Sequence, residues 1–328
     1  MAAQLTPSQC KTLVDQAILG LRLTDRSPAG LYSPIEYILG LGGKRIRPSL
    51  TLISCNLFND SVSQALMPAV GLEIFHSFSL LHDDIMDRSL LRRGKPTVHS
   101  LWGDNSAILS GDAMSILAYE YIVQRPPAFL PEILSIFSRT ALQVCEGQQL
   151  DMDFESAPGT TMEEYIRMIT LKTSVLIGAS LQIGALCGGA PGSDALRMYR
   201  FGEQFGLAFQ IQDDLLDTFG NEEILGKPIG GDIRENKKTW LWIKAFEEAG
   251  EKQRAGLTAL SQLPASESVQ KFAETCRLFR ELSIPEKARR QIAFHYEAAR
   301  AWLMEVQVPQ EHKVQLLNFL NSLINREY

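Results

Sequence analysis

Apolar residues recur every three or four positions along most of the chain, which is the spacing of one face of an α-helix. Over residues 8–18, Leu13 and Ala17 lie on one such face, and Thr6 and Pro7 precede it as an N-cap and a first-turn proline. The same pattern predicts helices over residues 65–88, 106–121, 131–146, 162–186, 194–219 and 237–248, and three more between residues 265 and 328, separated by Pro285 and Pro309. Because no segment shows the sustained alternation of a β-strand, we predict an all-α fold.

Sequences with the chemistry of turns separate these helices. They are GLGGKRIRP at 40–48, RRGKP at 92–96, SAPGT at 156–160, GGAPG at 188–192 and the stretch 220–232. No linker rich in Pro, Ser or Gly divides the 328 residues, so we expect one large domain over residues 1–328.

The charge balance and the cysteines narrow the class of protein and its surroundings. With 38 acidic against 32 basic residues the formal net charge is −6, which argues against nucleic acid as a partner. The five cysteines are scattered and form no C-x-x-C pair, so we interpret them as small core residues and expect a reducing, cytoplasmic setting. The N-terminal sequence lacks a basic region followed by an apolar stretch, so we expect no secretory signal.

Residues 173–193 contain no charged side chain and therefore invite comparison with a membrane span. The segment is rich in Gly, Ala and Ser, carries Gln182 and ends in GGAPGS, which makes it weakly apolar for a bilayer helix of about 20 residues. We expect a buried helix and no membrane span.

Two short acidic sequences carry the strongest chemical signal in the chain. LLHDDIMD at 80–87 and IQDDLLD at 211–217 each place two adjacent aspartates and a third one turn later on a predicted helix. The aspartates are Asp83, Asp84 and Asp87 in the first box, and Asp213, Asp214 and Asp217 in the second. Like charges clustered beside apolar residues call for a cation between them, and oxygen ligands of this kind suit Mg²⁺ together with substrate phosphates. One box alone would equally fit an acidic patch on a solvated face, but two boxes with identical spacing favour a metal site.

Basic residues lie in the loops and at the helix entrances around these boxes. They are Lys44, Arg45, Arg47, Arg92, Arg93, Lys172, Lys227, Lys237 and Lys238. Guanidinium groups bind diphosphate oxygens bidentately and lysines act as compact charges, so the set predicts a ligand that carries phosphate. For any single Lys or Arg, the alternative is solvated surface charge.

The motifs and their order resemble the trans-type isoprenyl diphosphate synthases, also called polyprenyl synthetases. The resemblance runs from residue 42 to residue 239 through GGKRIRP, LLHDDIMD, LRRGKPTVH, GD at 111–112, GQQLDMD, KTS, FQIQDDLLD, GKPIGGD and KKT. It implies an all-α bundle of mostly antiparallel helices around a central cavity, a homodimer, and an enzyme of the short-chain farnesyl or geranylgeranyl diphosphate synthase type.

By this resemblance the enzyme is a trans-prenyltransferase that joins isopentenyl diphosphate head-to-tail to an allylic diphosphate: dimethylallyl, geranyl or farnesyl diphosphate. The two boxes would face each other across the cavity mouth and hold about three Mg²⁺ ions, with Asp83, Asp87 and Asp213 as direct ligands and the other three aspartates in support. The metals would withdraw charge from the leaving diphosphate, and isopentenyl diphosphate would attack the resulting allylic cation.

The resemblance also implies which residues bind the substrates. Those for isopentenyl diphosphate would be Lys44, Arg47, His76 and Arg93. Those for the allylic diphosphate would be Arg92, Lys172, Lys227 and Lys237, while Thr173 and Gln210 would present neutral oxygens to the cation. His76 has the alternative of an ordinary core histidine, and Asp151 is either a supporting group or an ordinary polar residue. We interpret His82 as structural.

Product length would be set along the helix that carries the first box, because the growing chain descends beside it at about 5.4 Å per turn. Ser79 lies one turn before Asp83 and is small, whereas Phe78 beside it and Phe75 one turn deeper are large. In the family, bulk at the positions of Phe78 and Ser79 stops elongation early. The pattern resembles the geranylgeranyl type and predicts a C20 product first and a C15 product second.

Two other functions share part of this pattern. A class I terpene cyclase would have the first box and a helical fold but no need of Lys44, Arg47 and Arg93. A non-catalytic regulatory subunit of a synthase would have an eroded box, and neither box is eroded here. Both boxes together with both basic clusters favour the chain-elongating enzyme.

Overall fold

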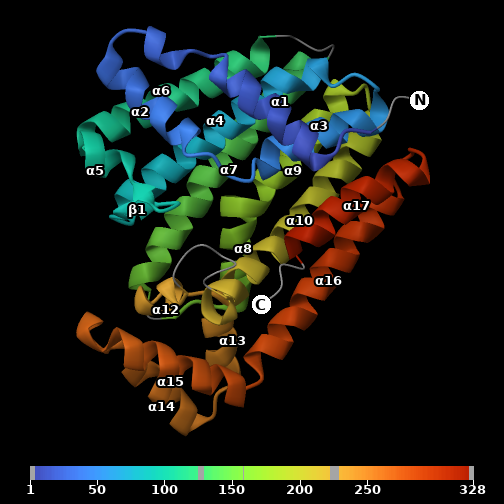
Figure 1. Cartoon of the computed structure of the whole chain (residues 1–328). Coiled ribbons are helices and arrows are strands. Elements are labelled where there is room, and N and C mark those ends of the chain that lie inside the picture. Colours follow the sequence, from blue (N-terminus) through green and yellow to red (C-terminus); the bar gives the residue numbers. More distant parts are fainter. Residues whose placement is uncertain (1–3, 125–128, 158, 222–228, 325–328) are drawn as a thin grey trace. The chain divides into compact units, whose positions relative to one another are not determined.

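Helices account for nearly all of the structure, which is a computed structural model describing residues 4–124, 129–157, 159–221 and 229–324 (Figure 1). The all-α prediction is confirmed. The chain divides into two compact units, each built from segments that are distant in sequence. Unit 1 comprises Met1–Ala141, Ile177–Tyr199 and Leu303–Phe319, and unit 2 comprises Leu142–Leu176, Arg200–Trp302 and Leu320–Tyr328.

The elements of the first half of the chain include α4, whose C-terminal end carries the first aspartate box. They are α1 (Pro7–Leu19), the 3₁₀ turn η1 (Leu23–Asp25), α2 (Ala29–Gly40), α3 (Ile46–Phe58), α4 (Ser63–Met86), β1 (Leu91–Arg92), β2 (Lys95–Pro96), α5 (Val98–Trp102), α6 (Asp104–Val123) and α7 (Leu130–Ser156).

The elements of the second half carry the second box on α10. They are α8 (Met162–Ile169), the π-helix η2 (Thr170–Ser174), α9 (Val175–Cys187), α10 (Gly192–Phe219), α12 (Gly231–Arg234), α13 (Trp240–Glu248), α14 (Glu251–Ser261), the 3₁₀ turn η3 (Ala265–Glu267), α15 (Ser268–Glu281), α16 (Ile284–Met304) and α17 (Gln310–Ile324).

Threonine caps explain where several helices begin. The Thr6 hydroxyl accepts from the backbone N–H of Gln9, whose side chain accepts from the N–H of Thr6, and this capping box starts α1. Thr161 starts α8 in the same way. The Thr239 hydroxyl accepts from the N–H of Trp242, so the last residue of the KKT motif is the N-cap of α13.

In unit 1, α4 and α6 approach each other closely at two glycines. A Cβ on Gly71 of α4 would lie 2.7 Å from the carbonyl oxygen of Ala118 on α6. Farther along, the His82 ring fills the space beside Gly111, and its Nε2 donates to the carbonyl of Ile108 at 3.2 Å. The glycine of the GD motif therefore makes room for His82, which fixes the first box against α6 and agrees with a structural role for this histidine.

In unit 2, two glycines bring neighbouring helices against the π-helix η2. Gly147 of α7 leaves room for the backbone of Lys172, and Gly206 of α10 leaves room for Ser174. Single π-helical turns are rare and occur mostly at functional sites. The two glycines thus hold in place the widened turn that carries Lys172 and Thr173.

Most predicted helices are present with shifted bounds, and some elements were not predicted. α7 ends at Ser156 rather than at residue 146, because Gly147 lies inside the helix, where it serves the contact with Lys172. The turn predicted at 92–96 is a short antiparallel hairpin that pairs Leu91 with Pro96. The helices α2, α3, α5, α12 and α14 had no predicted counterpart.

The cysteines and the apolar segment were partly predicted. Cys10, Cys55, Cys187 and Cys276 are buried, but Cys145 is exposed on α7, so the core interpretation is wrong for that residue.

Among the described residues, one helical stretch, Met162–Cys187, is long and apolar enough to cross a membrane by length and composition alone. Its most apolar window is 83% buried inside the structure, as in the core helix of a folded unit.

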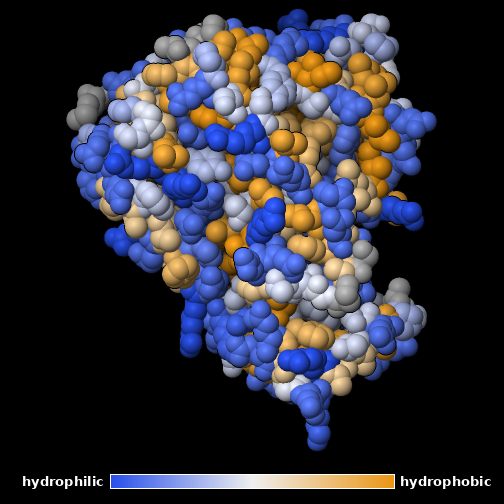
Figure 2. All heavy atoms as spheres, turned by 180° about the vertical axis from the view of Figure 1, so that it is seen from behind, coloured by the Kyte–Doolittle hydropathy of each residue, from blue (hydrophilic) through white to orange (hydrophobic). Residues whose placement is uncertain are grey.

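The surface mixes hydrophilic side chains with separate apolar patches, as the face in Figure 2 shows. In unit 1, α6 contributes several large apolar side chains that are exposed to solvent. They are Ile108, Leu109, Ile116, Tyr119 and Val123.

Candidate active site

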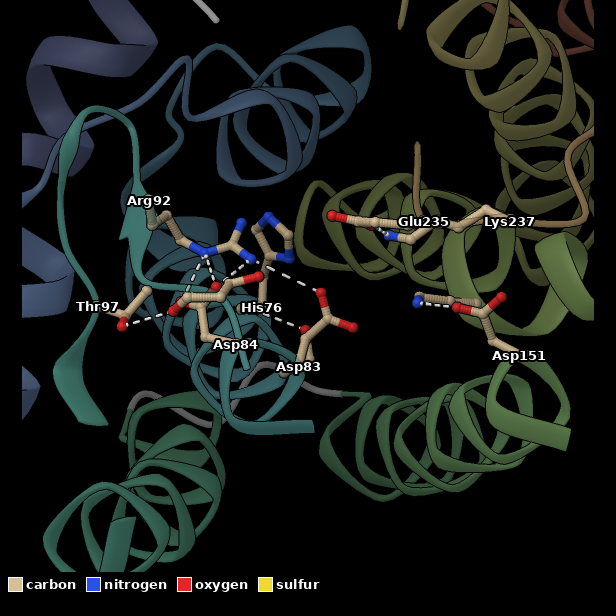
Figure 3. Close-up of polar contacts among 11 residues, drawn as sticks. His76, Asp83, Asp84, Arg92, Thr97, Asp151, Glu235 and Lys237 are labelled. Atoms are coloured by element: carbon tan, nitrogen blue, oxygen red, sulfur yellow. Dashed lines mark hydrogen bonds and ion pairs between the residues drawn. The ribbon is translucent and has the colours of Figure 1, made fainter. Parts of the chain in front are cut away.

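The first aspartate box ends α4, and an arginine from the following hairpin holds its middle carboxylate. Arg92 donates to Asp84 through Nε at 2.8 and 2.9 Å and through Nη2 at 2.7 Å (Figure 3). The same guanidinium lies 3.7 Å from Asp83. The Asp84 side chain is 3% exposed and that of Asp83 is 19% exposed, while Asp87 is exposed. Asp83 and Asp87 are therefore the accessible carboxylates of this box.

Burial and the arginine act in opposite directions on Asp84. Removal from water raises the pKa of its carboxyl, and the Arg92 guanidinium offsets only part of that rise. Because Arg92 neutralises Asp84, the charge that the first box presents to a ligand comes from Asp83 and Asp87.

A second cluster of cations in unit 1 joins Arg47, His76 and Arg93. Nη1 of Arg47 lies 2.9 Å from Nε2 of His76, and since a guanidinium only donates, that nitrogen of His76 carries no proton. Burial, together with the neighbouring arginines, lowers the pKa of His76 well below its usual value, so the ring is neutral. A Cβ on Gly43 would lie 2.6–2.7 Å from the Arg93 guanidinium, so this glycine admits Arg93 to the loop before α3.

One donor of this cluster is buried without a partner. Among the described residues, Nε of Arg47 donates to no hydrogen-bond acceptor although no solvent reaches it. Burial lowers the pKa of Arg47 to about 10, which leaves the guanidinium charged at neutral pH. A buried, charged donor of this kind is the feature expected of an anion site.

Arg45 and Lys44 of the same motif differ from Arg47. The Arg45 side chain is 3% exposed and donates to Asp15 at 2.9 Å, to Glu73 at 2.7 Å and to the carbonyl of Leu39 at 2.6 Å. Its donors hold α1, α2 and α4 together, so its role is structural. The Lys44 side chain is exposed.

In unit 2, hydrogen bonds join the π-helix to the second box. Nζ of Lys172 donates to Oδ2 of Asp151 at 2.6 Å, so Asp151 holds the Lys172 ammonium group in place (Figure 3). The Thr173 hydroxyl donates to Oε1 of Gln210 at 3.1 Å, and Nε2 of Gln210 donates to Oδ1 of Asp214 at 3.1 Å. Asp214 thereby turns the Gln210 carbonyl oxygen toward Thr173.

Asp214 is held by neutral donors. Its Oδ2 accepts from the Tyr165 hydroxyl at 2.5 Å and from the N–H of Trp240 at 3.0 Å. Burial raises the pKa of the carboxyl to about 6, although the hydrogen bonds from Tyr165, Trp240 and Gln210 each lower it. Asp214 is 4% exposed, and both of its oxygens already accept hydrogen bonds. Asp213 beside it is half-buried.

Asp217 fastens the loop that follows the second box. Its Oδ2 accepts from the N–H of Asp232 at 3.0 Å, and its backbone carbonyl accepts from the N–H of Gly230 at 2.6 Å. Lys237 lies after this loop, with Nζ 3.3 Å from Glu235 (Figure 3). Lys227 lies outside the described residues.

The proposed determinants of chain length form one aromatic cluster with His82. The Phe78 ring centroid lies 5.4 Å from that of Phe75 and 4.8 Å from that of His82. Phe75 is 2% exposed and touches the buried Phe137, with ring centroids 5.3 Å apart, so it belongs to the core. The Ser79 hydroxyl donates back to the carbonyl of His76 at 2.8 Å. Phe78 is half-buried and is braced from two sides.

The carboxylates suit a metal ion that is bound together with a phosphate. Among the described residues, no group of three Asp, Glu, His or Cys side chains can hold a metal ion by itself. Mg²⁺ usually keeps waters and binds through one or two carboxylates plus substrate phosphates. The accessible pair Asp83 and Asp87 in unit 1, and Asp213 in unit 2, fit this mode of binding.

Sequence reasoning missed the groups that position Asp214 and Arg93. Tyr165 lies far from the second box in sequence and belongs to no motif that we recognised. Trp240 directly follows the KKT motif, which is a signal that its backbone lies near the site. The first glycines of GGKRIRP lie in the predicted turn, but the sequence does not show that Gly43 also makes room for Arg93.

Comparison with known proteins places these features in a family. The polyprenyl synthetase family model matches residues 28–279. The short chain isoprenyl diphosphate synthase of Methanothermobacter thermautotrophicus is 37% identical over 307 residues, which cover 93% of each chain. The geranylgeranyl diphosphate synthase of Methanosarcina mazei is 42% identical over 237 residues, covering 72% of this chain and 73% of its own.

Solved structures give the same result at the level of the fold. A crystal structure of geranylgeranyl pyrophosphate synthase superimposes with a TM-score of 0.93 at 40% identity, covering 99% of this chain and 100% of that one. The geranylgeranyl pyrophosphate synthase from Corynebacterium glutamicum, complexed with isoprenyl diphosphate and magnesium, has a TM-score of 0.86 at 26% identity and covers 98% of both chains.

Proposed function

The chain belongs to the polyprenyl synthetase family as a trans-prenyltransferase of the short-chain type, and from this premise we propose that it condenses isopentenyl diphosphate with an allylic diphosphate to give a C20 product. The observation that carries the proposal is the buried, unpartnered Nε of Arg47 beside His76 and Arg93. This cluster is distinct from Arg92 on the first box, so the chain offers a separate anion site for a second diphosphate. A terpene cyclase, which binds one diphosphate, has no use for it.

Each substrate would be bound by its own set of cations. Isopentenyl diphosphate would be bound by Lys44, Arg47, His76 and Arg93. The allylic diphosphate would be bound by Arg92, Lys172, Lys227 and Lys237. The oxygens of Thr173 and Gln210 would face the developing cation, which requires neutral groups because a carboxylate would trap it. The hydrogen bond from Gln210 to Asp214 supports this, since it directs the amide oxygen away from the carboxylate.

Mg²⁺ is the metal that fits the donor set. Asp83, Asp87 and Asp213 would hold about three ions on the allylic diphosphate, with Asp84, Asp214 and Asp217 as buried supports. When bound, Mg²⁺ would supply Lewis-acid withdrawal of charge from the departing diphosphate. The magnesium and isoprenyl diphosphate named with the Corynebacterium structure support this choice.

Phe78 would end elongation of the growing chain. Its ring is braced by Phe75 and His82, so it cannot turn aside without disturbing the core. Phe78→Ala should therefore lengthen the product beyond C20, as read by mass spectrometry. Phe294→Ala, which removes an exposed ring from α16, is the matched control and should leave the length unchanged. An unaltered product from Phe78→Ala would remove this residue from the cavity wall.

The experiment that tests the function is a product assay. Purified protein, Mg²⁺ and isopentenyl diphosphate are combined separately with the dimethylallyl, geranyl and farnesyl diphosphates, and the products are identified by mass. Accumulation of C20 from all three primers is expected. Consumption of an allylic diphosphate without isopentenyl diphosphate would favour the cyclase instead.

We further propose a cytoplasmic homodimer in which α6 contributes to the interface. The exposed apolar side chains of α6 support this, because monomeric proteins rarely expose a large contiguous apolar patch. Ile116 is the most exposed of them, at 69%. Ile116→Asp should halve the mass measured by light scattering, and an unchanged mass would exclude α6 from the interface. The free cysteines support a reducing compartment.

A further inference from the structure

The segment 229–239 connects the second aspartate box to Lys237, and its contacts with the box are close. Gly230 and Asp232 donate their N–H groups to Asp217, at 2.6 Å to the backbone carbonyl and 3.0 Å to Oδ2. Within the segment, the N–H of Lys237 donates to the carbonyl of Asp232 at 2.9 Å. The position of Lys237 therefore depends on how this segment is held.

Helix α15 holds the segment from its other side. Nζ of Lys271 donates to the carbonyl of Arg234, the last residue of α12, at 3.1 Å. The Phe272 ring lies directly against Gly230, whose φ of 79° and absent Cβ permit the contact. The Arg234 guanidinium lies 5.6 Å from the centroid of the same ring. Two adjacent residues of α15 thus fix both ends of α12.

Burial of the Lys271 ammonium group costs free energy of solvation. Lys271 is 2% exposed, and burial lowers the pKa of its amine. An apolar side chain in the same place would avoid the cost of removing an ammonium group from water. The amine therefore has a positional task, which is to hold the carbonyl at the end of α12.

We propose that Lys271 and Phe272 are positioning residues for the allylic diphosphate, acting through segment 229–239 on Asp217 and Lys237. The inference rests on the proposed function. Neither side chain would touch substrate, and both would act by keeping the segment in one conformation against the second box. Loss of either should weaken binding of the allylic diphosphate and leave isopentenyl diphosphate binding unchanged.

A matched control exists in unit 1. Lys313 is also buried, at 5% exposed, and its Nζ donates at 2.9 Å to the carbonyl of Met304, the last residue of α16. Lys271→Met and Lys313→Met therefore remove the same group from the same kind of contact. The loss of stability should be similar in the two variants. A difference in substrate binding between them would therefore show the effect of the contact that Lys271 makes with segment 229–239.

The test is steady-state kinetics of the full chain with geranyl diphosphate and isopentenyl diphosphate varied in turn. Lys271→Met removes the hydrogen bond that the charged amine donates to the carbonyl of Arg234. The KM for geranyl diphosphate should therefore rise about tenfold, and the KM for isopentenyl diphosphate should not change. Phe272→Leu should change the same constant by a smaller factor, and it replaces Lys271→Met if that variant does not fold. Lys313→Met should change neither constant.

Equal constants for Lys271→Met, Phe272→Leu and wild type would overturn the inference, as would equal rises for both substrates. Failure of the proposed function looks different, because the wild-type protein would then consume no isopentenyl diphosphate.

Discussion

The two aspartate boxes share one spacing but hold their middle carboxylates in opposite ways. Asp84 is buried against a cation, the Arg92 guanidinium, at 2.7 Å. Asp214 is equally buried but is held by the neutral donors Tyr165, Trp240 and Gln210. Burial raises the pKa of both carboxyls, and that of Asp214 reaches about 6.

The difference shows that one motif can serve two tasks in one chain. In the first box, Arg92 cancels a buried charge and couples α4 to the hairpin that carries Arg93. In the second box, Asp214 orients Gln210 and joins α8 to α13 through Tyr165 and Trp240. The accessible carboxylates are Asp83 and Asp87 in the first box and Asp213 in the second, while Asp217 is 4% exposed and holds the loop that follows its box.

The largest expected effect concerns what the boxes share. Asp83→Ala and Asp213→Ala should each lower kcat by about 10³-fold or more, because in the proposed site each carboxylate is a direct ligand of the metal that stabilises the departing diphosphate. The unfolding temperature without metal should change little, since both side chains are partly exposed. Normal turnover in either variant would show that its box is not needed for catalysis.

The next effect is a difference between the boxes in the free energy of unfolding that is lost when the middle aspartate is replaced. Asp84→Asn leaves the Arg92 guanidinium without its carboxylate and should cost about 3 kcal/mol, whereas Asp214→Asn keeps one acceptor oxygen for its neutral donors and should cost no more than about 1 kcal/mol. Urea unfolding at pH 7.5 in EDTA measures both. Equal losses, or a larger loss at Asp214, would contradict the contrast drawn between the two carboxylates.

A related effect is the pH dependence that Asp214 confers. Its pKa rises from 3.8 in the unfolded chain to about 6 in the folded one, so the folded state binds more protons between these values. The contribution of Asp214 to stability is therefore largest at low pH and is lost as pH rises from about 4 to 6, by about 1.4 kcal/mol for each pKa unit. The difference in unfolding free energy between wild type and Asp214→Asn should follow this curve. A difference independent of pH would place the carboxyl pKa near its usual value.

The sequence predicted what depends on local pattern and motif. Apolar spacing located most helices, and the repeated aspartates located both boxes. It could not predict the π-helix, because nothing in TLKTS marks it, and the turn is shaped by Gly147 and Gly206 on other helices. Nor could it predict that Arg45 is structural while Arg47 retains a buried donor without a partner. The difference arises because the fold places Asp15, Glu73 and the carbonyl of Leu39 beside Arg45, and the sequence does not show this placement.

The most direct test of the central claim is a calorimetric titration of Mg²⁺ into the protein with an unreactive thio analogue of geranyl diphosphate. If both boxes hold the same metal–diphosphate cluster, wild type should bind about three ions, and Asp83→Ala and Asp213→Ala should each weaken that binding by at least tenfold. Wild-type binding by either variant would contradict the claim, because it would leave one box outside the cluster.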